Sequence, residues 1–226
     1  DPTPWRQQAD DVAAAIQERL WNPSTGRFAA SGEDPGSPCL HGQVLALRFG
    51  IGDAHTLLTT IEPELRANFR QGIERGQNSG HLELYFQVYL LPALEALERF
   101  DLAEALILEH FALLQSLGHP SLNECFCRAN HGVGSCCHSW SGYAAVYATR
   151  NILGLRQATP GNPNCWIFAP RTHISDKVSG TLPIQGGKIE VTWTRKNGSL
   201  SATINHPEEI EIHSAENILF PDIPSS

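Results

Sequence analysis

The chain has 226 residues, of which 41% are hydrophobic and 18% charged; this composition is typical of a packed globular protein and excludes a disordered one. Its formal net charge of -8, with lysine only at positions 177, 188 and 196, excludes the basic face of a nucleic-acid-binding protein. No apolar run approaches the roughly 20 residues that cross a bilayer, so we expect neither nucleic acid nor a membrane among its partners.

The first part of the chain has the periodicity of helices. Thr3-Pro4 predicts a helix start with a capping hydroxyl, and apolar residues then recur at three- and four-residue intervals as far as Leu20. A turn and a short extended segment, at 27–30, should follow. Further helices are predicted over 40–50, 54–75, 81–99, 102–117 and 139–153. Pro63 and Pro92 should break or kink two of them.

Near residue 158 the period of the hydrophobic pattern changes from 3.6 to 2. Strands are predicted over 165–170, 178–182, 188–195, 199–204 and 208–213. Asn197-Gly198, between two alternating runs, predicts a tight hairpin turn. The sequence thus predicts a helical domain over 1–157 and a small antiparallel β domain over 158–226.

The cysteines bear on the cellular compartment. There are six: Cys39, Cys125, Cys127, Cys136, Cys137 and Cys165. An even number favours three disulfides and an oxidising compartment, with the pairing left open. A zinc site in the stretch from Cys125 to His138 is the alternative, but its C-x-C and C-C spacings differ from those of structural zinc sites. We therefore expect an extracellular protein without metal or cofactor.

Two further features agree with secretion. Asn197-Gly-Ser is a glycosylation acceptor. The chain starts at Asp1 and contains no methionine, which we interpret as a processed or trimmed terminus.

One candidate catalytic residue is Glu124, in the loop sequence Ser121-Leu-Asn-Glu124. A carboxylate on a loop above a helical scaffold can act as a general base. The alternative is a capping box, in which Ser121 and Glu124 satisfy each other's backbone donors at the start of a helix.

A second candidate is the segment His138-Ser-Trp140-Ser-Gly-Tyr143. An imidazole next to aromatic rings suits a sugar site, because hydroxyls need polar partners and the apolar face of a sugar needs an aromatic platform. The alternative is a polar cap followed by buried aromatic packing. His41, at another helix start, is interpreted as a structural histidine.

Several segments together resemble the α-L-rhamnosidases of glycoside hydrolase family 78. The most specific is HSWSGYAAVYATRNILGLR from His138, continuing through Pro160-Gly161, which is similar to the family's H-x-W-S segment. Residues 20–28 resemble the F-W-D-x-x-T-G-x-Y helix end, and residues 42–51 the N-A-L-A-V-L-F-G-I segment. Residues 189–200 look like the family's carboxy-terminal β domain. The segments keep the family's order along nearly the whole chain.

This resemblance implies a mainly α fold with a β appendage: part of a six-hairpin (α/α)6 toroid, with about six helices, followed by a small antiparallel β-sandwich. The implied reaction is inverting hydrolysis of terminal α-L-rhamnose, with one carboxyl as acid and another as base. Glu124 occupies the place of the base in the family's T-x-W-E-like turn, although Asn123 stands where the family has tryptophan. His138 matches the histidine that touches the sugar, with Trp140 beside it.

The family's acid-bearing D-x-R-E-R-x-G-W-like stretch does not occur in these 226 residues. We therefore expect a rhamnose-containing glycan as ligand, and a missing amino-terminal half of the barrel, or a second copy of the chain, as partner. Two hypotheses follow. The chain is a fragment or processed subunit of a secreted rhamnosidase-like enzyme, inactive alone, or it is a noncatalytic carbohydrate-binding or self-assembling module derived from one.

Overall fold

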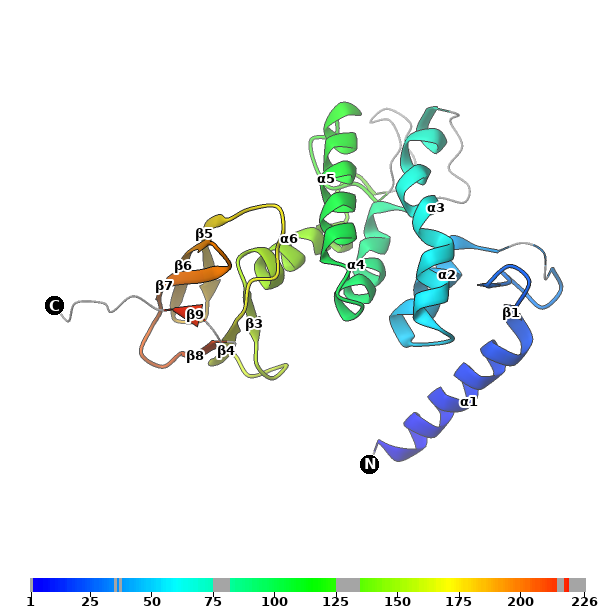
Figure 1. Cartoon of the computed structure of the whole chain (residues 1–226), viewed down its shortest axis with the longest axis horizontal. Coiled ribbons are helices and arrows are strands. Elements are labelled where there is room, and N and C mark those ends of the chain that lie inside the picture. The colour runs from blue at the N-terminus through cyan, green and yellow to red at the C-terminus, as the bar shows by residue number, and fades with distance from the viewer. Residues whose placement is uncertain are drawn as a thin grey trace. The chain divides into compact units, whose positions relative to one another are not determined.

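The structure, a computed structural model, describes residues 2–34, 36, 38–74, 82–124, 135–214 and 218–219, with the backbone alone for 68–74 and 218–219. The chain divides into two compact units, Asp1–Tyr143 and Ala144–Ser226. Figure 1 shows that the first is built from helices and the second mainly from strands. We call them the helical unit and the β unit.

The helical unit contains five α-helices in its described residues: α1 (Thr3–Leu20), α2 (Leu40–Phe49), α3 (Ala54–Glu74), α4 (Gln87–Ala96) and α5 (Phe100–Ser116). Two short 3-10 helices, η1 (Leu84–Phe86) and η2 (Ser139–Gly142), precede α4 and α6 (Tyr143–Tyr147). Each predicted helix is confirmed, with bounds that differ by a few residues. The extended return is also confirmed, because β2 (Arg27–Phe28) pairs antiparallel with β1 (Trp21–Asn22).

Two local predictions about these helices are wrong. The N-cap of α1 is Pro2, which makes no side-chain cap hydrogen bond, so Thr3 lies inside the helix instead of before it. Helices α3 and α4 each continue through their proline, Pro63 and Pro92. The predicted break is therefore wrong for both prolines, since tertiary packing on both sides of each proline outweighs the loss of one backbone hydrogen bond. The predicted kink stays a prediction.

Helices α2, α3, α4 and α5 form the core of the helical unit. Helix α2 packs against α3 and α4, and α5 packs against the same two helices. Their apolar side chains are fully or almost fully buried, for example Val44, Leu57, Ile61, Leu91 and Leu102.

Gln43 adds a polar link at the edge of this core. Its amide accepts a hydrogen bond from the backbone N–H of Phe28 and donates one to the Phe28 carbonyl, at 2.8 and 2.7 Å. These two bonds fix β2 against α2.

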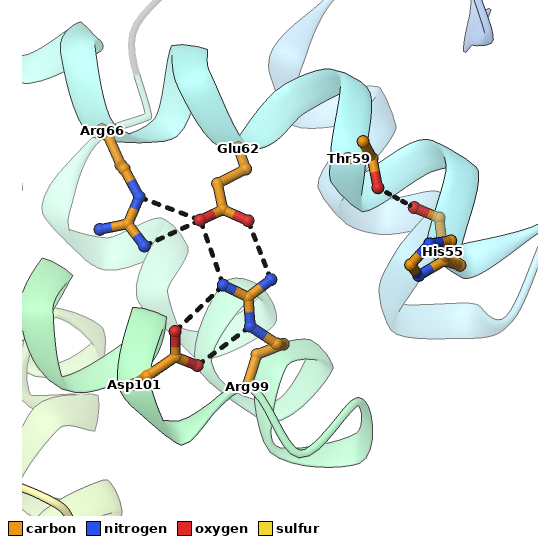
Figure 2. A network of polar contacts seen from close by, with 6 residues as sticks. All are labelled: His55, Thr59, Glu62, Arg66, Arg99 and Asp101. Atoms are coloured by element: carbon orange, nitrogen blue, oxygen red, sulfur yellow. Dashed lines mark hydrogen bonds and ion pairs between the residues drawn. The ribbon is translucent and has the colours of Figure 1, made fainter.

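An ion-pair network connects α3 to the start of α5 (Figure 2). The Arg99 guanidinium donates two hydrogen bonds to Glu62, at 2.8 and 3.1 Å, and two to Asp101, at 3.0 and 3.1 Å. Arg66, one turn after Glu62 on α3, donates to the same Glu62 carboxylate. Because Arg99 hydrogen-bonds to them, the pKa values of Glu62 and Asp101 are lowered.

The β unit begins with the end of a helix that was predicted over 139–153. The structure confirms a continuous helical stretch that passes from η2 through α6 to a π-helical turn at Ala148–Ile152. Gly154 then reverses the chain with a φ of +91°. A Cβ at this position would lie 2.7 Å from the backbone nitrogen of Pro170, so only glycine fits there.

Seven strands follow in the described residues: β3 (Leu155–Gln157), β4 (Cys165–Phe168), β5 (Lys177–Ile184), β6 (Gly187–Lys196), β7 (Ser199–Asn205), β8 (Glu211–Ser214) and β9 (Ile218–Leu219). They form one sheet of order β3-β4-β8 and another of order β5-β6-β7-β9. The long pairs are antiparallel, whereas β4 with β8 and β7 with β9 are parallel. The predicted hairpin is confirmed, since Lys196 pairs with Ser199 across Asn197-Gly198.

Side chains from both sheets meet in one apolar core. Leu155 and Phe168 come from the three-stranded sheet, and Ile189, Val191 and Trp193 from the four-stranded sheet. Alternation along β6 sends these three residues inward and their neighbours outward, as a period of two requires. The predicted architecture of helices followed by a small β-sandwich is confirmed.

Candidate functional site

The loop that carries Glu124 is fixed by hydrogen bonds to the segment before η2. The backbone N–H of Glu124 donates to the Ser135 carbonyl at 2.9 Å, and that of His138 donates to the Leu122 carbonyl at 2.8 Å. The Ser121 hydroxyl donates to the Cys136 carbonyl, and the buried Ser141 hydroxyl donates to the Asn123 carbonyl at 2.7 Å. The two segments, 121–124 and 135–141, therefore lie side by side.

These contacts decide between the two interpretations of Glu124. In a capping box, Glu124 would bond back to Ser121 at the start of a helix. Residues 121–124 instead form a loop, and the Glu124 carboxylate accepts the backbone N–H of Ser135 at 3.0 Å. The capping-box alternative is thereby excluded.

Glu124 lies next to His138. Its Oε2 atom is 3.9 Å from His138 Nδ1, and about a third of the Glu124 side chain is exposed. The carboxylate is thus held at one oxygen by the Ser135 backbone N–H, lies near the His138 imidazole, and remains open to solvent. A carboxylate in this position can accept a proton from a bound water or hydroxyl.

Aromatic rings surround His138. The His138 ring lies 5.5 Å from the Tyr85 ring and 5.2 Å from the Trp140 ring, measured between centroids. Trp140 itself is 63% exposed. The alternative of buried aromatic packing is therefore wrong for Trp140, which presents a ring to solvent as a sugar-binding platform would.

The structure adds two residues that the sequence did not single out, Glu83 and Tyr85. Both lie at the start of η1, which contacts η2. Burial raises the pKa of Tyr85, and the negative charges of Glu83 and Glu124 raise it further. Two carboxylates from distant parts of the sequence thus act on one phenol. Nothing in the local sequence Leu-Glu-Leu-Tyr-Phe marks these residues, because only tertiary packing brings Tyr85 to His138 and Glu83 to His41.

His41 is part of a second polar group next to this one. Its Nε2 atom lies 2.8 Å from Glu83 Oε2, and its Nδ1 atom 3.8 Å from Cys39 Sγ. The hydrogen bond with Glu83 raises the pKa of His41. Although burial raises the pKa of Cys39, hydrogen bonds with the Gly42 and His41 backbone and with the His41 ring outweigh it, so the pKa is lowered overall. His41 thus has the partners expected of a structural histidine.

The other candidate residues lie apart from this group. Asn197 is exposed at the β6–β7 turn, where a glycan could be attached. Cys39, Cys136, Cys137 and Cys165 are free thiols, and Cys125 and Cys127 lie outside the described residues. Since three disulfides would need all six cysteines, the structure does not support the predicted disulfide framework. Within the described residues, the group of side chains close enough together to hold a metal ion is in the β unit and contains Cys165.

None of the helices described has the length and apolarity to cross a bilayer.

Comparison with known proteins identifies the fold. No protein-family model and no curated protein matches the sequence. Among solved structures, the chain is similar to the family GH78 rhamnosidase of Bacillus sp. GL1, with a TM-score of 0.68, 20% identity and coverage of 93% of this chain. It is also similar to the α-L-rhamnosidase from Dictyoglumus thermophilum, with a TM-score of 0.69, 18% identity and coverage of 94%.

A third similar structure is the Streptomyces avermitilis α-L-rhamnosidase complexed with L-rhamnose, with a TM-score of 0.66, 15% identity and coverage of 95%. The aligned region covers 23%, 23% and 21% of these three chains, so this chain spans less than a quarter of their length. The resemblance in fold to family 78 rhamnosidases is confirmed, and with it the predicted combination of (α/α) barrel helices and a β domain.

Proposed function

We propose that this chain is the part of a rhamnosidase-like glycoside hydrolase that supplies a sugar-binding surface and the general base. The observation that carries the proposal is the grouping of Glu124, His138, Tyr85 and Trp140 within a fold that matches α-L-rhamnosidases over 93–95% of the chain. The expected ligand is a glycan that ends in α-L-rhamnose.

In this proposal Glu124 activates water. The Ser135 N–H holds one of its oxygens, His138 lies close to it, and the exposed part of the carboxylate is available to a water molecule. His138 and Trp140 bind the sugar, the imidazole through a hydroxyl and the indole through the apolar face of the ring. An inverting reaction also needs an acid on the other side of the glycosidic bond, and we propose that the remainder of a longer barrel supplies it.

The helical unit supports a partner of this kind. Helix α1 has no buried residue, and Trp5 and Val12 on its apolar face are 74% and 51% exposed. Exposed apolar residues on one helix face are typical of a surface that another element covers. A further portion of the barrel, or a second copy of this chain, would bury them.

The noncatalytic alternative is a sugar-binding module. The exposed Trp140 ring favours it, because binding needs the platform and not the base. Both hypotheses require rhamnose binding, and only the first requires Glu124.

For the protein's location we propose secretion, with glycosylation at the exposed Asn197. Enzymatic deglycosylation should lower the mass of the native protein and should leave the mass of Asn197→Gln unchanged. An unchanged mass of the native protein would contradict glycosylation.

The decisive experiment measures rhamnose release from an aryl α-L-rhamnoside and rhamnose binding by calorimetry on the same purified chain. We expect binding without release. His138→Ala and Trp140→Ala should weaken binding, whereas the matched controls His206→Ala and Trp5→Ala should not. Release by the chain alone would contradict the missing acid, and absence of binding would contradict the sugar site.

Catalysis by Glu124 is tested in the complete assembly. There Glu124→Gln should lower turnover by about 100-fold or more, the usual contribution of a general base, while Glu208→Gln in the β unit leaves turnover unchanged. Equal turnover of wild type and Glu124→Gln, with rhamnose binding intact, would favour the noncatalytic module.

A further inference from the structure

A polar group lies on the outer face of the three-stranded sheet of the β unit. Strands β4 and β8 pair in parallel, with Cys165 opposite Glu211 and Ile167 opposite His213. Because side chains alternate along a strand, Cys165, Glu211 and His213 share one face of this strand pair. The opposite face carries Trp166 and Ile212, which pack against the apolar core.

The three side chains have the separations of metal ligands. The Cys165 thiol sulfur, a Glu211 carboxylate oxygen and a His213 ring nitrogen all lie within 4.8 Å of one another. His213 Nε2 is 3.1 Å from Glu211 Oε1. Zinc bonds of about 2.0–2.3 Å in a tetrahedron place neighbouring ligands roughly 3.3–3.8 Å apart. Small side-chain rotations would therefore bring all three atoms onto one ion.

The donor set selects the kind of ion. A thiolate and an imidazole bind zinc strongly and bind calcium or magnesium poorly, since those ions prefer oxygen ligands. The charges of a thiolate and a carboxylate together balance those of a divalent cation. Glu211 and His213 are exposed and Cys165 is half-buried, so a fourth position on the ion is accessible to water.

We propose that Cys165, Glu211 and His213 bind Zn²⁺ with three protein ligands and one water. The ion would link β8 to β4 through side chains, in addition to their backbone ladder. This site is independent of the proposed function, because it lies in the β unit and uses none of the sugar-binding residues.

Two other roles for these residues make different predictions. Glu211 and His213 alone would form an exposed ion pair, which contributes about 0–1 kcal/mol and does not need the thiol. A disulfide at Cys165 would remove the thiolate and exclude the metal. Cys165 is a free thiol in the structure, as zinc binding requires.

The test uses the full chain, treated with chelator and kept reduced, and titrated with Co²⁺ as a spectroscopic probe and with Zn²⁺ by calorimetry. We expect a thiolate-to-cobalt charge-transfer band and one tight Zn²⁺ site per chain. Cys165→Ser should remove the band and weaken Zn²⁺ binding at least roughly 10-fold, because a hydroxyl is a poor ligand for this ion. His213→Ala should also weaken binding, with the band reduced or lost.

The matched controls are Cys137→Ser, an exposed cysteine of the helical unit, and His206→Ala, an exposed histidine of the β unit. Both should keep the band and the affinity. The proposal is overturned if Cys165→Ser binds like the wild type, if Cys137→Ser loses the band, or if peptide mapping of the unreduced protein finds Cys165 in a disulfide. Circular dichroism of each variant separates lost binding from lost fold.

Discussion

Both units have a buried apolar core, but they differ in the polar groups that they bury and in one exposed helix face. The β unit has a core of apolar residues from both sheets, with Trp193 and Phe168 completely buried. The helical unit buries more polar groups among its apolar ones, including Gln43, Gln87 and His110, whereas the β unit buries Asn151 and Thr172. No residue of α1 is fully buried. The helical unit thus holds most of the buried polar groups, and among the described residues it leaves Trp5 and Val12 exposed on one face of α1.

This difference indicates where function and assembly lie. A buried polar group costs stability unless it is hydrogen-bonded, and natural proteins depart from a purely apolar core chiefly at functional sites. The proposed sugar site and the uncovered α1 are both in the helical unit. We therefore expect core substitutions to have their largest effects in the β unit, and pH and charge substitutions to act mainly in the helical unit.

The largest expected effect comes from Trp193→Ala. Trp193 is fully buried, and its indole N–H donates to the Ile152 carbonyl at 3.1 Å. The substitution should lower the free energy of unfolding of the β unit by about 3–5 kcal/mol, because it leaves a cavity and an unpaired carbonyl. Urea unfolding, with hydrogen exchange of β6 peptides, would measure it.

Trp5→Ala is the matched control for this loss. Trp5 is 74% exposed on α1, so we expect a change within about 0.5 kcal/mol. Equal losses for the two substitutions would contradict the contrast between the units, since they would mean that α1 is covered in solution.

The next effect is acid sensitivity of the helical unit through His110. Burial lowers the pKa of His110 to about 3, and Gln87 lies 2.5 Å from its ring nitrogen. The unfolded chain therefore takes up this proton near pH 6.5 while the folded chain does not. The neutral His110 therefore contributes its full share to the free energy of unfolding above pH 6.5. As the pH falls from 6.5 toward 3, this free energy decreases by up to roughly 1.4 kcal/mol per pH unit.

Urea midpoints between pH 7.5 and pH 5 would show this loss, and His110→Asn, which cannot take up a proton, should have a flatter profile. His206→Asn, at an exposed position of the β unit, should retain the wild-type slope. A wild-type slope in His110→Asn would show that other groups cause the acid sensitivity.

A smaller effect is expected from the ion-pair network on α3 and α5. Arg99→Ala removes four hydrogen bonds to Glu62 and Asp101 and should cost about 1–2 kcal/mol at pH 7. Because Arg99 lowers the pKa of Glu62 and Asp101, this stability is present above their ordinary pKa values and is lost as pH falls through the lowered ones.

Arg66→Ala removes only the helix-surface pair with Glu62 and should cost no more than about 0.5 kcal/mol. Thermal unfolding at pH 7 and pH 3 would compare the variants. If Arg99→Ala were as mild as Arg66→Ala, the bidentate geometry would contribute nothing in solution.

The smallest effect concerns the reactivity of Cys39. Its lowered pKa gives Cys39 more thiolate at neutral pH than an ordinary cysteine. Between pH 9.5 and pH 7, alkylation of Cys39 by iodoacetamide should therefore slow less than alkylation of a cysteine in an unstructured peptide. His41→Ala, which removes a hydrogen bond to the thiol, should reduce this advantage. Identical pH profiles of Cys39 in the wild type and in His41→Ala would contradict the role of His41.

Helix and strand positions followed from the sequence because they depend on local periodicity. The Asn197-Gly198 turn was predictable because few residues other than glycine and asparagine adopt its positive φ values, 51° and 79° here. Pro63 and Pro92 did not break their helices. A proline inside a helix costs about 3 kcal/mol of stability, and the packing of the surrounding helix can exceed that cost. The parallel partners of β4 and β7 were missed because pairing between strands far apart in sequence has no local signal.

The residues of the candidate site also differ in whether local sequence or tertiary packing brings them together. Glu124, His138 and Trp140 were found from residue type and order, since the polar and aromatic residues stand close together along the chain. Glu83 and Tyr85 were not singled out from the sequence, because they precede Glu124 by about 40 residues along the chain. They join the site only when η1 packs against η2.

The sequence by itself determined the types of elements and their order, and it predicted the residues that we propose bind the sugar, because each of these depends on neighbours within a few turns of the chain. Only the tertiary structure decided which carboxylates act on Tyr85, that Glu124 is bonded to Ser135 and not to Ser121, and that Cys165 lies beside Glu211 and His213. Those facts depend on contacts between distant segments, whose geometry is set by burial of the whole core.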